Sequence, residues 1–200
     1  MDSSTASQTT DRRERKTHAA LEAALLDLLA SKDYDAITVQ EICDRADIAR
    51  KTFYEHYVDK HALLAAYTER VFAALQASVG GLDADTLLAD GKPLTYPVFK
   101  HVQDYARFYR AMLGSHSTSA FIMRLLDYAA QVSYERHAPL RAAAPRITVP
   151  PELIAHYLAG ALLGSIHWWL KTDLQATAET MAYQFSQLAV PGILDALGLS

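Results

Sequence analysis

The sequence is poor in cysteine, with Cys43 the single one among 200 residues. One thiol excludes an internal disulfide, which fits a reducing compartment such as the cytoplasm. A lone cysteine also offers no paired thiolates for a structural zinc site. The polar opening, Met1 to Thr10, has no apolar stretch of the kind that a secretory signal contains, so we expect no export signal there.

Sequence motifs for catalysis are also missing. The chain has no nucleophile elbow, no glycine-rich phosphate loop and no paired-histidine helix motif. His101 and Asp104 lie one helical turn apart, but no second close-set pair of metal ligands accompanies them. We therefore expect no metal, no cofactor and no enzymatic activity.

No stretch alternates between apolar and polar residues as a half-buried β-strand does, and no segment is repeated. Apolar residues recur instead at every third or fourth position, and alanine and leucine dominate. We predict an all-α fold in which a three-helix, helix-turn-helix domain precedes a larger helical domain. The expected divisions are a disordered polar tail at 1–11, the helix-turn-helix at 12–58 and the larger domain at 59–200.

Helical spacing begins at Arg12 and returns in several later segments. Further long helices are expected from Asp59 to Val79, from about Tyr96 to Met112, from Ala120 to His137, from Pro151 to about Lys171 and from about Thr177 to Ala189. The stretch from Pro139 to Pro150 lacks apolar spacing and predicts a loop. Pro191 is expected to stop or kink the last helix.

A capping box marks the centre of the small N-terminal domain. In Thr38-Val39-Gln40-Glu41, the threonine hydroxyl accepts from the third backbone N–H and the glutamate reaches back to the first residue. A short helix is expected to follow, then a turn at Asp47 and Ile48, and then a second short helix from about Ala49 to His56. A DNA-binding helix-turn-helix has this layout: a tight turn joins two short helices, and a longer helix packs across both.

Net charge alone does not identify a nucleic-acid binder. The chain carries −4, and residues 1–60 hold nine Lys and Arg against twelve Asp and Glu. Phosphate attraction is local at physiological salt, however, so the distribution of charge matters more than its sum. Basic residues cluster in residues 12–16, and again at Arg45, Arg50 and Lys51. The charge pattern is therefore compatible with DNA binding.

Several spaced residues in this region resemble the TetR family of bacterial regulators. The resemblance covers about Arg12 to Val71. The segments that carry it are Ile37-Thr38-Val39-Gln40-Glu41-Ile42, Ala46-Asp47-Ile48-Ala49 and Thr52-Phe53-Tyr54-Glu55-His56-Tyr57-Val58-Asp59-Lys60. Two positions depart from the family pattern: Asp47 replaces the usual turn glycine, and Ala49 replaces the serine that caps the recognition helix. We expect Asp47 to adopt a left-handed backbone at modest cost.

The polar face of the second short helix is expected to meet the major groove. Arg50 and Lys51 can donate to guanine or to phosphate, and the Tyr54 hydroxyl can donate to phosphate. Lys60, at the start of the next helix, is expected to meet a phosphate, because its ammonium and the backbone N–H groups there favour an anion. The full set of residues expected at the DNA is Thr38, Ala49, Arg50, Lys51, Thr52, Tyr54, His56 and Lys60.

The resemblance also implies a homodimer, a ligand cavity in the C-terminal domain, and a long helix from Asp59 that links the two domains as a lever. We expect the dimer to form through the helix from Leu153 to Leu170 and the helix from Thr177 to Ala189, with Met181, Phe185, Leu188 and Ala189 at the interface. Gly160 and Gly164 would allow a close approach. The alternative is that these helices only build the core of one protomer.

The central region is dense in aromatic residues, as effector cavities often are. A tyrosine hydroxyl or His101, His116 or His167 would provide the polar anchor. The residues expected to bind an unidentified small molecule are Tyr105, Phe108, Tyr109, Phe121, Tyr128, His167 and Trp168. Around 160–170 the chain is also loosely similar to the C-terminal region of dihydroxyacetone kinase regulators, which names no ligand.

The sequence thus favours a ligand-responsive, homodimeric DNA-binding regulator, usually a repressor in this family. Two alternatives remain open: a helical binding protein or enzyme whose N-terminal helices serve another partner, and a DNA binder without a sensor. The uncharged segment from Leu153 to Leu170 reaches the lower length limit of a membrane span, but it contains two histidines, a tyrosine and a serine. We expect a buried helix there and no membrane partner.

Overall fold

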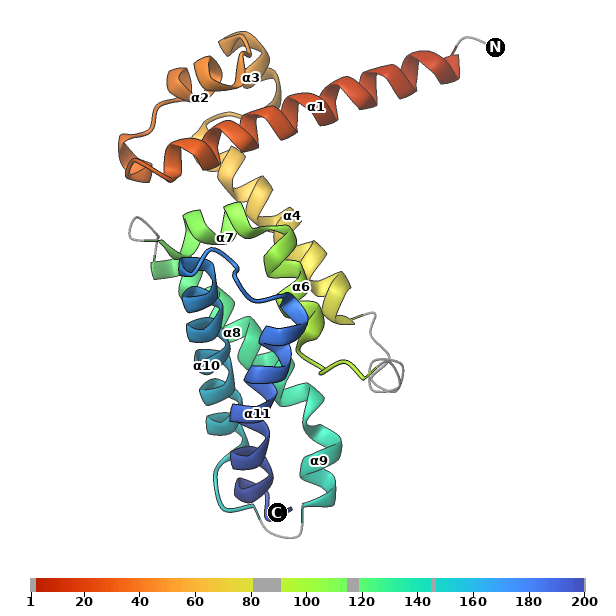
Figure 1. Cartoon of the computed structure of the whole chain (residues 1–200). Helices are drawn as coiled ribbons and strands as arrows, with labels where there is room; N and C mark the ends of the chain where they lie inside the picture. The colour runs from red at the N-terminus through yellow and green to blue at the C-terminus, as the bar shows by residue number, and fades with distance from the viewer. Residues whose placement is uncertain (1–2, 81–90, 115–118, 145–146, 200) are drawn as a thin grey trace. The chain divides into compact units, whose positions relative to one another are not determined.

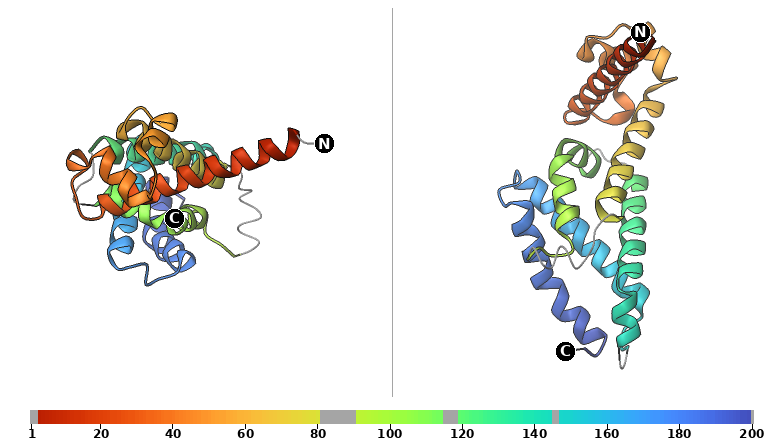
Figure 2. Two further views of the ribbon diagram at one scale, coloured as in Figure 1. Left: turned by 90° about the horizontal axis from the view of Figure 1, so that it is seen from above. Right: turned by 90° about the vertical axis from the view of Figure 1, so that its right-hand side faces the viewer.

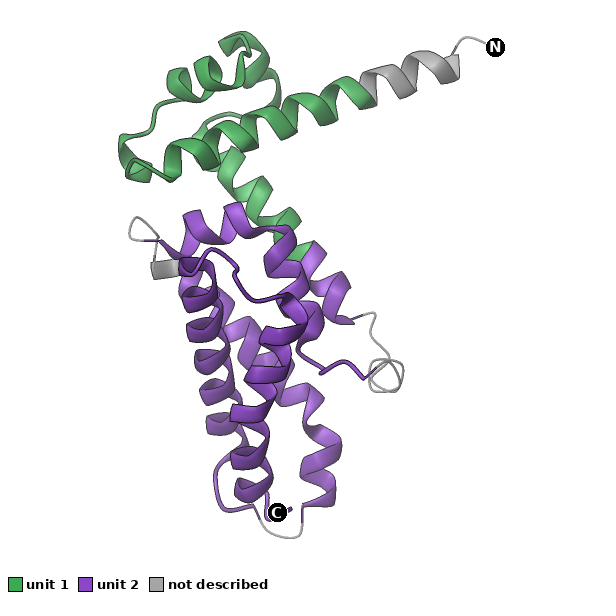
Figure 3. Ribbon diagram, viewed as in Figure 1, with its two compact units in different colours: residues 1–73 green, residues 74–200 purple. Residues whose placement is uncertain are grey.

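The computed structural model describes residues 3–80, 91–114, 119–144 and 147–199, with backbone alone at 3–11 and 119–120. Within these ranges every regular element is a helix (Figure 1), as predicted. The chain divides into two compact units, residues 1–73 and 74–200 (Figure 3). The long helix α4 (Lys60–Gly80) runs without a break from one unit into the other.

Unit 1 contains the expected three-helix arrangement. Helix α1 (Ser3–Leu29) packs against α2 (Val39–Ala46), and α2 contacts α3 (Arg50–His56), as Figure 1 shows. A short 3₁₀ turn, η1 (Tyr34–Ala36), connects α1 to α2. The apolar side chains that share the core of this unit are Leu21, Leu25, Ile37, Ile42, Phe53 and Leu63, each fully buried.

Helix α1 begins at Ser3, inside the segment that we expected to be disordered. Residues 1–30 contain neither proline nor glycine, so nothing in the sequence interrupts a helix that extends toward the N-terminus from its packed half. The composition of the segment indicated disorder, whereas helix propagation needs only one backbone hydrogen bond for each added residue.

Unit 2 is a bundle of two helix pairs. Helix α8 (Ser119–Arg136) lies along α10 (Pro151–Lys171), and α6 (Tyr96–Asp104) lies along α11 (Ala178–Ala196), as Figures 1 and 2 show. Helix α7 (Ala106–Leu113) contacts both α8 and α10. The largest fully buried side chains of this unit are Trp169, Phe99, Phe108, Leu197 and Val102.

A hydrogen-bonded turn connects α10 to α11. Asp173 and Leu174 both have φ of 57°, which is unusual for residues with a side chain. Arg110 of α7 holds the turn through its Nη2, which donates to Asp173 Oδ1 at 2.7 Å. Trp169 Nε1 donates to the carbonyl of Ala176 at 2.9 Å on the other side. These contacts stabilise a backbone conformation that these residues would not favour alone.

Three sequence predictions in unit 2 were wrong at the level of helix boundaries. The stretch expected to be a loop contains a short helix, α9 (Ala138–Ala143), because Pro139 suits a first helical turn, where no N–H is needed. The helix expected from Tyr96 to Met112 breaks at Tyr105, which separates α6 from α7. Helix α11 continues past Pro191 to Ala196.

Helix α10 alone, among the described helices, has the length and apolar composition of a membrane span. A core helix satisfies the same test. Eight of its side chains, from Ile154 to Leu170, are buried within unit 2. The helix is therefore buried on one side only, since 39% of its most apolar window is buried.

Candidate functional site

The capping box predicted at the start of α2 is present. The Thr38 Oγ1 accepts from the Glu41 backbone N–H at 3.2 Å, and the Thr38 N–H donates to Glu41 Oε2 at 2.9 Å. Lys32 also contacts this box, because its Nζ donates to Glu41 Oε1 at 2.6 Å. These contacts fix the first turn of the helix that precedes the turn of the helix-turn-helix.

Lys32 and Thr38 together lower the pKa of Glu41 to about 2, chiefly through the hydrogen bond from the Lys32 ammonium. A depressed pKa in the folded state stabilises the fold above the ordinary carboxyl pKa of 4.5. This stabilisation is lost as the pH falls from about 4.5 toward 2.

A Glu41→Gln variant is therefore expected to melt below the wild type at neutral pH, with a difference that shrinks steadily below pH 4.5. Melting curves of both proteins between pH 2 and 7 measure this difference. A gap that stays constant over the whole range would show that the Glu41 charge does not stabilise the capping box.

The turn between α2 and α3 depends on Asp47. Its φ of 54° and ψ of 46° are left-handed, as predicted from its place at the usual glycine position. The following N–H, of Ile48, donates to the carbonyl of Cys43 at 3.0 Å and closes the turn. Ala49 precedes α3 and offers no side-chain hydrogen bond to cap it. The orientation of α3 therefore depends on the packing of its buried side chains.

Two aromatic residues anchor α3 in unit 1. Phe53 is fully buried and Tyr57 is nearly so, with ring centroids 5.9 Å apart. The opposite side of this helix carries Arg50, Lys51 and Tyr54, all exposed, with Tyr54 at 49%. The structure thus brings together the three side chains on which the DNA-binding hypothesis depends most.

Arg50 and Tyr54 form a pair on this face. The Arg50 Nη2 lies 3.4 Å from the Tyr54 hydroxyl, and its guanidinium carbon lies 5.8 Å from the centre of the ring. Such a contact limits the rotamers of a long side chain, which lowers the entropy lost on binding. Glu55, which the sequence prediction omitted, is exposed on the same side, where its carboxylate is a suitable acceptor for cytosine N4.

The remaining predicted DNA residues lie at the edges of this face. Ala49 is exposed and Thr52 is half-buried. His56 is half-buried against α1, with its ring 4.8 Å from that of His18. His18 also contacts the Tyr57 hydroxyl through Nδ1, and burial lowers the pKa of His18. His56 thus joins α3 to α1.

Lys60 and Thr38 also make hydrogen bonds within unit 1. The Lys60 ammonium has three protons, and it donates to the carbonyls of Tyr34, Asp35 and Ile37 at 2.8, 3.0 and 2.7 Å. The Thr38 hydroxyl donates its one proton to Glu41 Oε2 at 2.9 Å. Both side chains thus stabilise the fold of unit 1, and their contact with DNA stays a prediction.

A second basic group precedes the packed part of α1. Arg12, Arg13 and Lys16 are exposed on this helix, with Arg15 beside them. At 100° per residue the four lie on one broad face of the helix, with Glu14 on the other side. This face carries positive charge next to the three packed helices of unit 1.

The aromatic residues predicted to bind an effector form a connected cluster in unit 2. Phe108 packs edge-on against Tyr109 and Phe121, at centroid distances of 5.5 and 5.6 Å. Burial raises the pKa of Tyr109, and the nearby hydroxyls of Tyr105 and Tyr128 raise it further. Five of the seven predicted residues therefore lie together, on α7, α8 and the junction of α6 with α7.

The other two predicted effector residues lie on α10. Trp168 is 56% exposed, on the outer side of this helix, and His167 is half-buried. His116 lies outside the described residues. The buried histidine that contacts the aromatic cluster is His101, whose ring centroid is 4.6 Å from that of Tyr105 and 5.8 Å from that of Tyr109.

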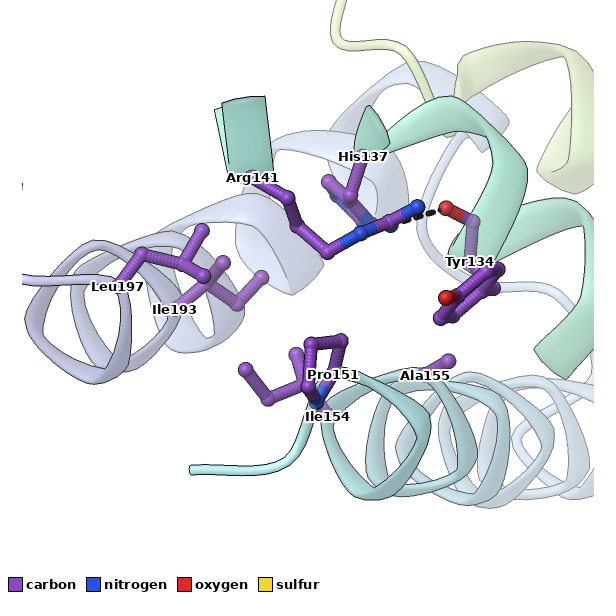
Figure 4. Close-up of a pocket in the computed structure, with 8 residues that line it drawn as sticks. All are labelled: Tyr134, His137, Arg141, Pro151, Ile154, Ala155, Ile193 and Leu197. Atoms are coloured by element: carbon purple, nitrogen blue, oxygen red, sulfur yellow. Dashed lines mark hydrogen bonds between the residues drawn. The ribbon is translucent and has the colours of Figure 1, made fainter. Parts of the chain in front are cut away.

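Unit 2 also contains a small pocket at the end where α9, α10 and α11 meet (Figure 4). His137 and Arg141 line one side, and Ile154, Ile193 and Leu197 are among the apolar residues that line it. Its volume is about 10 Å³, which is room for about one water molecule. This pocket is too small to hold an organic effector.

One outer face of α10 is apolar. Leu153, Tyr157 and Trp168 are exposed, Tyr157 at 66%, at spacings that place them on one stripe. Gly160 and Gly164 lie on the same stripe, and a Cβ added at either would meet nothing within 4 Å. Packing within the protomer therefore does not explain why both positions lack a side chain.

The outer face of α11 differs from the one we predicted. Met181, Phe185 and Ala189 are buried in unit 2, where Phe185 packs against Phe99 at 6.2 Å. Leu188 alone of the predicted four faces outward, at 81% exposure. The spacing of Met181, Phe185 and Ala189 does place them on one face of a helix, but that face packs against α6 within the protomer.

Two family models match this chain. The model described as bacterial regulatory proteins, tetR family, matches residues 21–67. A second, described as transcriptional regulator C-terminal region of the TetR type, matches residues 91–190, which is half of the chain. The first model covers most of unit 1, including the capping box and α3. The second model covers most of unit 2.

A curated relative, the uncharacterized HTH-type transcriptional regulator YxbF of Bacillus subtilis (strain 168), is 44% identical over 66 residues. The match covers 32% of this chain and 17% of that protein, so the chain spans less than a fifth of that relative's length. Its name describes a regulator with a helix-turn-helix.

Solved structures resemble the fold over nearly the whole chain. A TetR transcriptional regulator from Streptococcus agalactiae 2603V has a TM-score of 0.64 at 23% identity, covering 92% of this chain and 98% of that one. The dihydroxyacetone kinase operon activator DhaS has a TM-score of 0.57 at 16% identity, covering 88% and 96%. At these identities the likeness shows the fold.

Proposed function

Because this chain belongs to the TetR family of bacterial regulatory proteins, we propose that it is a cytoplasmic, homodimeric transcription regulator that binds DNA and responds to a small molecule. The observation that carries this proposal is the exposed face of α3, where Arg50, Lys51 and Tyr54 project together from a helix anchored by Phe53. As a repressor, it would lower transcription from promoters beside its binding site.

Two copies of α3 would enter successive major grooves on one side of the duplex. Dimeric helix-turn-helix proteins place their recognition helices about 34–36 Å apart, which is one turn of DNA. Arg50 and Lys51 would contact bases or phosphates within each half-site, and the basic face at residues 12–16 would contact the flanking backbone. The binding site would accordingly be a near-palindrome.

The homodimer would form through α10 and α11. The apolar stripe of Leu153, Tyr157 and Trp168 supports this proposal, because a monomer gains nothing from exposing it. The open space at Gly160 and Gly164 supports it further, since small residues let a second helix approach closely. Leu188 on α11 extends the same kind of surface.

A Gly164→Arg variant is expected to fold but to remain monomeric. The added side chain meets no atom of its own protomer within 4 Å of its Cβ, and arginine favours a helix more than glycine does. At the proposed interface the same side chain would place a charge between two closely packed helices. Sedimentation velocity measures the mass, and circular dichroism checks the fold.

Gly80→Arg provides the matched control, because its Cβ also meets nothing within 4 Å and it lies outside the proposed interface. This variant should sediment as the wild type does. If Gly164→Arg were as dimeric as Gly80→Arg, α10 would not be the dimer contact.

The effector would act through the spacing of the two heads. Helix α4 is continuous between the units, so a change in unit 2 has a direct covalent route to the DNA-binding unit. A ligand that prefers the dimer with the wrong spacing must weaken DNA binding, and DNA must weaken ligand binding equally. Such coupling is typically about 1–3 kcal/mol.

Selection of genomic DNA fragments by the purified protein tests the proposal. A regulator should enrich a few fragments and shift them in a gel more strongly than unrelated DNA, with a shift that weakens as salt rises. An enzyme or another helical binding protein should enrich none. A transcription assay from the promoter beside an enriched fragment then gives the sign of regulation.

A further inference from the structure

His101 is a buried polar side chain whose Nε2 has no hydrogen-bond partner. The residue is 3% exposed on α6, and this nitrogen has no partner within the structure. A buried polar atom without a hydrogen-bond partner destabilises the folded state, so native proteins contain few such atoms. An apolar residue of similar size would fill the same place without that cost.

The surroundings of this imidazole are aromatic. Tyr105 covers one face at a 30° tilt, and Tyr109 meets it edge-on at 83°. Tyr109 continues through Phe108 to Phe121 on α8. Tyr105, which covers the imidazole, is itself half-buried, so the cluster meets solvent at that side chain.

His101 differs in chemistry from the other buried side chains of unit 2. Leaving tyrosine and tryptophan aside, it is the one buried polar or charged residue among the side chains that the structure describes in unit 2. Burial lowers the pKa of His101 to about 4, against a small opposing effect of Asp104, so the ring is neutral at physiological pH. A neutral imidazole has one donor and one acceptor nitrogen, and it offers no compensating charge to an ion.

We propose that His101 is the polar anchor of the effector site, and that the effector is a small, uncharged aromatic molecule with one hydroxyl or carbonyl group. This inference rests on the proposed ligand-responsive function and specifies the chemistry of its effector. The polar group would pair with Nε2, and the ring would pack against Tyr105, a half-buried member of the cluster. An anion or a cation would lose its hydration without gaining an opposite charge.

Three aromatic probes of similar size and different charge test the inference on the full-length protein. They are benzyl alcohol, benzoate and benzylammonium, each at about 10 mM because ligands with so few atoms bind in the millimolar range. Benzyl alcohol is expected to raise the melting temperature by about 3 °C, and the two ions are expected to raise it by less than about 1 °C. The tyrosine rings make benzylammonium a stringent competitor, since a cation can bind to their faces.

Two histidine variants separate an anchor from a structural residue. His101→Phe is expected to melt about 2 °C above the wild type without ligand, because it removes the unpaired nitrogen, and to lose the response to benzyl alcohol. His137→Phe makes the same substitution at a half-buried histidine elsewhere in unit 2, and it should keep that response.

The wild-type measurements decide the inference even if His101→Phe does not fold. A larger rise with benzoate or benzylammonium, or no rise with any probe, would overturn it. A full response of folded His101→Phe to benzyl alcohol would do the same. DNA binding by the wild type is measured separately, so failure of the effector inference leaves the proposed regulator function standing and is distinguishable from its failure.

Discussion

Replacing Arg50 and Lys51 together by alanine is expected to lower operator affinity by at least about 100-fold without changing the melting temperature. Each good contact of this kind contributes about 1–3 kcal/mol to recognition, and the dimer would lose two in each half-site. Both side chains are exposed on α3, so their loss should change the free energy of unfolding by less than about 0.5 kcal/mol. Gel-shift titrations and melting curves measure the two quantities.

A control for charge is available in unit 2. The double variant Lys92→Ala and Lys100→Ala removes the same two positive charges from residues outside the proposed interface. It should bind the operator as the wild type does. For the α3 variant, each lost phosphate contact should also lower the slope of log affinity against log salt by about one. Unchanged affinity and slope would mean that another surface meets the DNA.

Lys60→Met is expected to produce the opposite result, a loss of stability of about 3 kcal/mol that lowers the melting temperature by about 10 °C. The Lys60 ammonium donates to three carbonyls between Tyr34 and Ile37, and it also lies 4.7 Å from the centre of the Tyr34 ring. Methionine keeps most of the side-chain length but leaves all three carbonyls without this donor. Melting curves measure the effect.

Lys51→Met is the matched comparison, since it makes the same substitution at an exposed lysine of α3. It should melt as the wild type does and bind the operator more weakly. A Lys60→Met protein that kept its stability but lost DNA affinity would contradict the structural role and place Lys60 at the DNA interface.

The elements that the sequence predicted well are those fixed by neighbouring residues. The capping box joins Thr38 to Glu41, three positions apart, and the left-handed turn depends on Asp47 alone. The exposed face of α3 follows from the two aromatic residues, Phe53 and Tyr57, that must be buried. Interactions within one or two helical turns leave a pattern in the sequence.

The features that the sequence could not predict depend on contacts between distant segments. The three carbonyls that Lys60 binds lie 23 to 26 residues away, and no local pattern pairs them with a lysine. The spacing of Met181 and Phe185 identified a helical face but not which neighbour would cover it. Likewise, the sequence offered His101 and His167 alike as polar anchors, and only the structure shows that His101 is buried with Nε2 unpaired.

Methylation interference on a selected operator fragment tests most directly whether α3 binds DNA in the major groove. Methylation of guanine N7 blocks contacts there, whereas methylation of adenine N3 blocks contacts in the minor groove. We predict interference at guanines in two half-sites one helical turn apart, reduced in the Arg50→Ala protein. Interference confined to adenines, or a guanine pattern that Arg50→Ala leaves unchanged, would contradict the account.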